Sequence, residues 1–171
     1  MEIENLKPDP YFITEAVLDD MIQKASRYKD KALLVVLYYF CPRTYELIGL
    51  IKDSFWVEGD KLYIRIANEK RQTERILLVE QNKYTYFILK YLEPKDLGVP
   101  VFRYGHNRNS NRLALLRLLK ALNPKCTWQT FHYSMNARFL QGGIDHSRIM
   151  AWNGWRSTKP YDRLKSLPRP V

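Results

Sequence analysis

The sequence predicts a mainly helical α+β domain that contains a small three-stranded antiparallel sheet. Apolar residues recur with helical spacing in residues 15–29 and again in 128–140. Between Phe55 and Val79 they instead alternate with polar residues, which is typical of half-buried strands. The 171 residues, 46% hydrophobic and 13% aromatic, suffice for one domain with a packed core and exclude a disordered polycation.

Three helices are expected in the first part of the chain. Thr14 can cap a helix over residues 15–29, whose acidic residues come early and basic residues late, as the helix dipole favours. Residues 30–31 (Asp-Lys) are expected to break the chain before a second helix. That helix, 32–40, is nearly all apolar and should be buried on most sides, and a third follows at 43–51.

The middle of the chain predicts a β-meander followed by a helix. Three short strands are expected, joined by turns at residues 58–60 and 68–72. A helical pattern returns at 81–92, and prolines and a glycine in residues 94–100 mark a connector.

Three more helices are expected in the last third of the chain. Ser110 should cap the first, and Asn123 with Pro124 should end it. The other two helices and the residues that end them are 128–140 with Gly142 and Gly143, and 145–152 with Asn153 and Gly154.

The net positive charge comes from the last 69 residues alone. The chain carries 28 basic and 18 acidic side chains, a net charge of +10. Residues 1–102 hold 15 basic and 16 acidic side chains, whereas residues 103–171 hold 13 and 2, a net +11. A basic face of this kind indicates a polyanionic partner, with nucleic acid as the first interpretation and a membrane surface as the second.

Cysteine content and hydropathy indicate a cytoplasmic protein with no membrane span. The longest apolar run, 32–41, is about half of what a bilayer requires. Cys41 and Cys126 lie far apart and predict small buried hydrophobic residues rather than a metal site or disulfide. The expected organisation is an extended lead-in at 1–11, the domain at 12–165, and a short tail at 166–171.

Four groups of polar residues in the sequence could take part in chemistry, and two of them lie in its first half. Arg43 and Glu46 stand three residues apart on a predicted helix, which taken alone indicates a surface ion pair. Lys70 lies near the tip of the predicted hairpin with Arg75 on the returning strand, which taken alone is an ordinary solvated hairpin.

The other two polar groups lie in the basic third of the chain. Gln129 and His132 share one face of a predicted helix, where a lone histidine is more often structural than catalytic. Tyr161 lies in a basic stretch, as one of 12 tyrosines in the chain.

Taken in order, these segments resemble the catalytic domain of the tyrosine recombinases, the phage-integrase family, over nearly the whole chain. The family's Gly-x-Arg-x-x-Glu-Leu is similar to CPRTYEL, with Arg43, Glu46 and Leu47, and departs at Cys41, where Gly is usual. Lys70 matches the family's hairpin lysine.

The later motifs of the family are degenerate in this chain. The family's His-x-x-Arg aligns with Gln129 and His132, so its second arginine is missing. Its Leu-Gly-His appears as residues 153–155 (Asn-Gly-Trp), and Trp is a known alternative there. Tyr161 follows Trp155 by six residues rather than the usual nine or so, and it is the only tyrosine downstream.

The resemblance implies cleavage and rejoining of DNA through a covalent 3′-phosphotyrosyl intermediate, with neither metal nor cofactor. Tyr161 would be the nucleophile, Arg43 would bind the phosphate, and Lys70 would protonate the leaving oxygen. Trp155 would contact the phosphate, and His132 would stand in for the missing guanidinium. Glu46 and Gln129 are expected to line the same pocket.

The missing arginine leaves two interpretations open. A histidine offers one donor at a time and is charged only near or below pH 6.5, so the resemblance implies a weakened recombinase of a mobile element or virus. The alternative is a recombinase-like domain that only binds DNA. Under either interpretation the expected partner is double-stranded DNA rather than a membrane, and the chain is expected to self-assemble on DNA as a dimer or tetramer. The residues expected to bind DNA are Arg75, Arg103, Arg108, Arg112, Arg156, Lys159 and Arg163.

Overall fold

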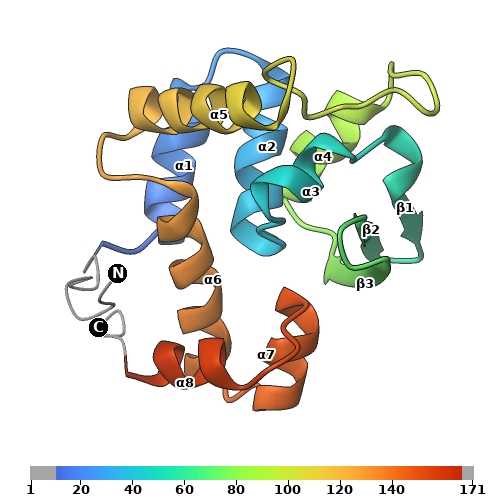
Figure 1. Ribbon diagram of the computed structural model, residues 1–171. Coiled ribbons are helices and arrows are strands. Elements are labelled where there is room, and N and C mark those ends of the chain that lie inside the picture. The colour runs from blue at the N-terminus through green and yellow to red at the C-terminus, as the bar shows by residue number, and fades with distance from the viewer. Residues whose placement is uncertain (1–10, 167–171) are drawn as a thin grey trace.

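A buried helix, α2 (Tyr28–Tyr39), forms the centre of the computed structural model, which describes residues 11–166. Every side chain from Ala32 to Tyr38 is buried, as the apolar run predicts. Three helices pack against α2, namely α1 (Glu15–Lys24), α4 (Thr85–Leu92) and α6 (Trp128–Gln141). In Figure 1, α5 (Arg108–Leu122) lies across one end of α1 and α2.

The start of α2 differs from the expectation, because the predicted break at residues 30–31 is wrong. Thr14 caps α1 as predicted, but α1 ends at Lys24 and α2 already begins at Tyr28. The guanidinium of Arg27 donates to both carboxylate oxygens of Asp30 at 2.9 Å. Asp30 therefore sits in the first turn of α2, where the helix dipole favours a negative charge.

The predicted three-stranded meander is confirmed. β1 (Phe55–Glu58), β2 (Lys61–Asn68) and β3 (Thr73–Glu80) pair antiparallel in the order β1-β2-β3. Before the sheet, the third helix is shorter than expected, with α3 at Thr44–Ile48 and a 3-10 turn at Lys52–Ser54. After the sheet, α4 begins four residues late because the Asn82 side chain holds a turn by accepting from the Tyr84 and Thr85 amides.

The three helices predicted after residue 103 are confirmed, with corrections to the residues at which two of them begin. Asn107, rather than Ser110, caps α5, and Ser110 is the third residue of the helix, where its hydroxyl oxygen accepts from the Asn107 backbone N–H. α7 (His146–Asn153) begins after the capping residue Asp145 and ends at Gly154. A further helix that the sequence analysis did not predict, α8 (Lys159–Lys165), carries Tyr161.

The arrangement leaves α7 and α8 at the end of α6 that lies farthest from α5 (Figure 1). α7 packs against both α8 and β3, so it connects the last helices with the sheet. No helix within residues 11–166 combines the length and apolar character needed to cross a bilayer. The expected lead-in and tail lie outside the described residues, apart from Tyr11 and Ser166.

Candidate active site

The centre of the candidate site is a buried carboxylate between two guanidinium groups. Glu46, whose side chain has no exposed area, accepts from Arg43 Nη1 at 3.0 Å and from Arg75 Nη1 at 2.6 Å. Arg43 precedes α3 as its N-cap residue and Arg75 lies on β3. The surface ion pair that spacing alone suggested is therefore a buried three-residue cluster, and Arg75, expected at the DNA surface, belongs to it.

Cys41, the residue at which this chain departs from the family motif, lies in the turn before Arg43. Cys41 has a φ of +39°, in the left-handed region that favours glycine. A cysteine in this position carries a strain that the family's usual Gly would not. Cys41 is buried, and burial raises the pKa of its thiol well above the ordinary value. The thiol is thus suited to packing and not to nucleophilic chemistry.

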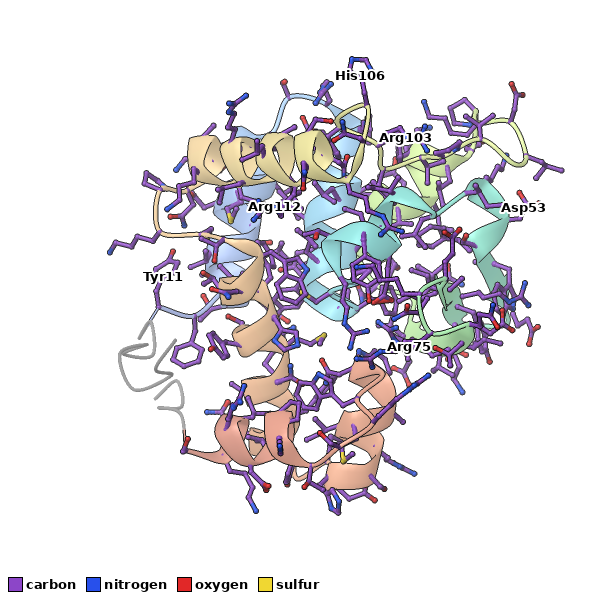
Figure 2. All side chains as sticks on the ribbon, viewed as in Figure 1. Tyr11, Asp53, Arg75, Arg103, His106 and Arg112 are labelled. Carbon is purple, nitrogen blue, oxygen red and sulfur yellow. The ribbon has the colours of Figure 1, made fainter. Side chains whose placement is uncertain are left out.

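Gly154 brings the end of α7 against both guanidinium groups. It has a φ of +68°, and a Cβ added there would lie 3.2 Å from Arg75 Nη1 and 3.5 Å from Arg43 Nη1. Arg75 also donates from Nε to the carbonyl of Trp152 at 3.0 Å. Residues far apart in sequence thereby meet at one point, and Figure 2 shows Arg75 where the sheet approaches α7.

His132 lies beside this cluster in an aromatic setting. Its ring stacks on Trp128 with centroids 4.9 Å apart and meets the edge of Trp155 at 5.8 Å. Trp128 in turn donates from Nε1 to the Pro42 carbonyl at 2.7 Å, which fixes α6 against the residue before Arg43. Arg43, His132 and Trp155, three residues of the predicted set, are therefore neighbours.

The hydrogen bonds and charge of His132 differ from those expected of a substitute arginine. Its Nε2 lies 3.0 Å from Asn153 Oδ1, and the Asn153 amide nitrogen donates to Asn136 Oδ1 and the Ile149 carbonyl. Oδ1 can only accept, so this shorter contact assigns the His132 proton to Nε2 and leaves a lone pair at Nδ1, although the Asn136 amide nitrogen also lies 3.4 Å from Nε2. Burial lowers the pKa of His132 to about 4, with a smaller contribution from Arg43, against the opposing hydrogen bond to Asn153. At pH 7 the ring is neutral.

Lys70 packs against Tyr45, which follows Arg43 by two residues. Its Nζ is 4.9 Å from the centroid of the Tyr45 ring, which Arg108 also approaches, and the Tyr45 hydroxyl accepts from Asn68 at 2.9 Å. Lys70 itself is exposed at the tip of the β2–β3 hairpin. Its neighbour in the turn, Arg71, instead reaches the residue that ends α7, because Arg71 Nη1 donates to the Gly154 carbonyl at 3.5 Å.

Tyr161 and Gln129 stand apart from the cluster. The Tyr161 ring is half-buried, 5.1 Å from the His146 ring, with Lys165 Nζ 5.1 Å from its centroid. Gln129 is exposed in the first turn of α6. Within residues 11–166, no hydrogen bond or ring contact joins Tyr161 to Arg43 or Trp155.

The remaining predicted DNA contacts are all exposed and form two groups. Figure 2 shows Arg103 and Arg112 at the beginning of α5. The first group is Arg103, Arg108 and Arg112 around the start of α5, and the second is Arg156, Lys159 and Arg163 in and before α8. In the first group, Arg108 approaches the same Tyr45 ring as Lys70, and in the second, Lys159 and Arg163 each lie two residues from Tyr161 along the chain.

Sequence reasoning missed three residues that build the site, namely Trp128, Asn153 and Arg71. Asn153 stood in the motif position of a family leucine, and its buried amide gave no signal in the sequence. Trp128 precedes His132 by one helical turn, which is the spacing at which two rings stack on one face. Only Arg71 carried a visible signal, because it neighbours Lys70 in the predicted turn.

Comparison with known proteins identifies the fold. No protein-family model and no curated protein matches the chain. Among solved structures, XerA recombinase aligns at a TM-score of 0.74 with 18% identity, over 93% of this chain and 61% of the other. XerH site-specific recombinase in a pre-cleavage complex with its difH substrate aligns at 0.68 with 12% identity, over 96% and 52%.

A third similar structure is the Tn1549 transposon integrase in complex with transposon right end DNA, at a TM-score of 0.63 and 15% identity, over 96% of this chain and 64% of that one. The chain thus spans between about half and two thirds of the length of the chains in these three structures. The helices of this chain, with their antiparallel three-stranded sheet, have the fold of the tyrosine-recombinase catalytic domain.

Proposed function

We propose that residues 12–165 form the catalytic domain of a tyrosine recombinase that cleaves and rejoins double-stranded DNA. One observation carries the proposal: residues from three separate motifs of the family lie together in a domain of the family's fold, with Arg43 beside Gly154 and His132 packed against the adjacent Trp155. The similar structures that contain DNA support the same partner. The expected setting is DNA in the cytoplasm.

The reaction uses the tyrosine hydroxyl as a nucleophile. The Tyr161 hydroxyl gives up its proton to water as its oxygen attacks phosphorus and forms a 3′-phosphotyrosyl bond, while the bond from phosphorus to the 5′-oxygen breaks. The leaving 5′-oxygen takes a proton from Lys70, and the reverse attack by a 5′-hydroxyl rejoins a strand. Arg43 binds a non-bridging oxygen and stabilises the charge of the transition state.

The other two residues of the cluster shape the pocket. Trp155 presents its indole to the phosphate, with His132 packed edge to face against it. A neutral His132 that donates from Nε2 to Asn153 has no N–H left for a phosphate, so it acts as a positioning residue. Glu46 holds Arg43, and Gln129 at the solvent end of α6 remains a predicted pocket residue.

Two of the proposed residues must move before the reaction. Tyr161 leaves the His146 ring, and Lys70 leaves the face of Tyr45. Helix α8 has only seven residues and follows an exposed segment, so it can be re-placed as a unit, toward its own site or that of a neighbouring subunit. Assembly of two or four chains on DNA fits either route.

Two observations favour the alternative, a domain that only binds DNA. Tyr161 is engaged by His146 and Lys165, away from Arg43, and the site contains a neutral histidine where the family has a guanidinium. In this alternative the exposed basic groups at α5 and α8 still bind phosphates, and affinity still falls steeply with salt.

A covalent-trapping assay separates the two functions. The protein is incubated with nicked duplexes that include the flanks of its own gene and a pool of randomised sequence, then resolved under denaturing conditions. The recombinase gives a DNA adduct that disappears in Tyr161→Phe and Arg43→Ala and persists in the matched control Tyr86→Phe, an exposed ring on α4. Salt-dependent binding of the same duplexes without any adduct would refute catalysis and support the binding-only domain.

A further inference from the structure

The site contains a second guanidinium that the family's motifs do not place there. We infer that Arg75, from strand β3, contacts the scissile phosphate together with Arg43 and supplies the charge that the missing helix α6 arginine would have given. This inference rests on the proposed function. It rejects His132 as the substitute, because His132 is neutral at pH 7 and its N–H points to Asn153.

Position is the first argument. The Nη1 atoms of Arg43 and Arg75 both lie within 3.5 Å of the Cβ position that Gly154 leaves empty. Trp155, the next residue, occupies the family's phosphate-contacting position. An oxyanion that binds Arg43 and the indole of Trp155 therefore also comes within reach of Arg75.

Hydrogen-bonding capacity is the second argument. A guanidinium has five N–H donors in a fixed plane. Arg75 uses Nε toward the Trp152 carbonyl at 3.0 Å, and Nη1 and Nη2 toward the two oxygens of Glu46 at 2.6 and 3.5 Å. Each terminal nitrogen keeps one further N–H without an acceptor among residues 11–166, and the side chain is 13% exposed. The guanidinium is thus held by three hydrogen bonds and keeps further donors, and a donor fixed in advance is the preorganisation that transition-state binding requires.

Net charge is the third argument. Glu46 is buried and pairs with both arginines, so Arg43 and Glu46 alone would present a neutral pair to the phosphate. Arg75 makes the cluster net positive by one charge. Two other cations near Gly154 are exposed and less constrained, since Arg71 reaches its carbonyl only at 3.5 Å and Arg156 reaches the Arg71 carbonyl at 3.4 Å.

Binding of a simple oxyanion tests the site without any DNA chemistry. Tungstate is titrated into the wild type, Arg75→Ala, Arg75→Lys and the control Arg65→Ala by calorimetry at pH 7.5, with circular dichroism to establish that each variant is folded. Arg65 is an exposed arginine on the neighbouring strand β2. We expect Arg75→Ala to weaken tungstate binding at least tenfold, Arg75→Lys to weaken it less, and Arg65→Ala to leave it unchanged. Equal affinity in Arg75→Ala and the wild type, or no binding to the wild type, would overturn the inference.

A charge-rescue measurement then separates contact with the phosphate from support of Glu46. Nicked duplexes carry either a normal phosphate or an uncharged methylphosphonate at the cleavage position. With phosphate, Arg75→Ala should form the adduct on the order of 10²–10³ more slowly than the wild type, as for loss of one preorganised donor. With methylphosphonate, its rate should approach that of the wild type, because the charge that Arg75 neutralises is absent.

The outcomes distinguish this inference from the proposed function. An equal defect on both duplexes would show that Arg75 only supports the fold of the site, and would overturn the inference while leaving the recombinase intact. If Arg75→Lys alone folds, the same comparison applies to it, with a smaller defect. Tungstate binding that depends on Arg75, without an adduct in the wild type, would uphold the two-arginine oxyanion site and refute the proposed cleavage.

Discussion

Replacement of Glu46 by Gln tests the buried cluster most directly. Glu46 has no exposed side-chain area and balances two guanidinium groups, at 3.0 Å from Arg43 and 2.6 Å from Arg75. Gln keeps the volume and one acceptor oxygen but removes the charge, so two like charges remain close together. Removal of one partner from a buried ion pair costs about 3–5 kcal/mol of unfolding free energy.

Thermal unfolding followed by circular dichroism measures the effect. In a domain of this size about 1 kcal/mol corresponds to roughly 2–4 °C, so Glu46→Gln should lower Tm by about 10 °C. The matched control is Glu74→Gln, because Glu74 is 61% exposed and lies 3.8 Å from Arg65. An exposed pair of this kind contributes at most about 1 kcal/mol. A Tm for Glu46→Gln no lower than that of the control would refute the reasoning that the carboxylate is buried and charged.

Three further predictions concern pH, Gly154 and the α5 cap. Burial lowers the pKa of His132 to about 4, below the ordinary 6.5, so the folded protein takes up a proton less readily than the unfolded chain. The free energy of unfolding is therefore full above about pH 6.5 and falls toward pH 4, by at most about 3 kcal/mol. Urea unfolding should show a flatter pH profile in His132→Gln, and an unchanged slope would contradict that pKa. Gly154→Ala should lower the free energy of unfolding by about 1–2 kcal/mol and reduce adduct formation, because φ is +68° and the new Cβ would press on Arg75. A variant with both the stability and the adduct yield of the wild type would exclude that contact. Asn107→Ala should cost about 1 kcal/mol in chemical denaturation whereas Asn107→Asp should cost much less, and equal losses would argue against the side-chain cap.

Local sequence patterns were enough to predict most helices and all three strands. The period of apolar residues and the turn residues around Gly59 depend on neighbours within a few positions, so the meander and the buried α2 follow from sequence. The errors occurred where a side chain acts on the backbone from a few residues away. Asn107, rather than Ser110, caps α5, and Arg27 places Asp30 inside α2.

The candidate site was predictable only in part, because local spacing predicts which residues pair but not what each one does in the fold. Arg43 and Glu46 lie three residues apart on one element, and their pairing follows from helix geometry. The alignment with the family's motifs also predicted that His132 and Trp155 belong to one site, and their rings are in contact in the structure. The role of each group in that place did not follow from its position in a motif.

By itself, the sequence determined the order of the elements, the basic charge of the last third and the residues offered for chemistry. Tertiary structure alone decided that Arg75 turns inward to Glu46, that His132 is neutral, and that Tyr161 rests on His146. The physical reason is that charge state and hydrogen-bond direction depend on burial by segments distant in sequence. Gly154 illustrates the point, since it lies 79 residues from Arg75 along the chain and touches it in the fold.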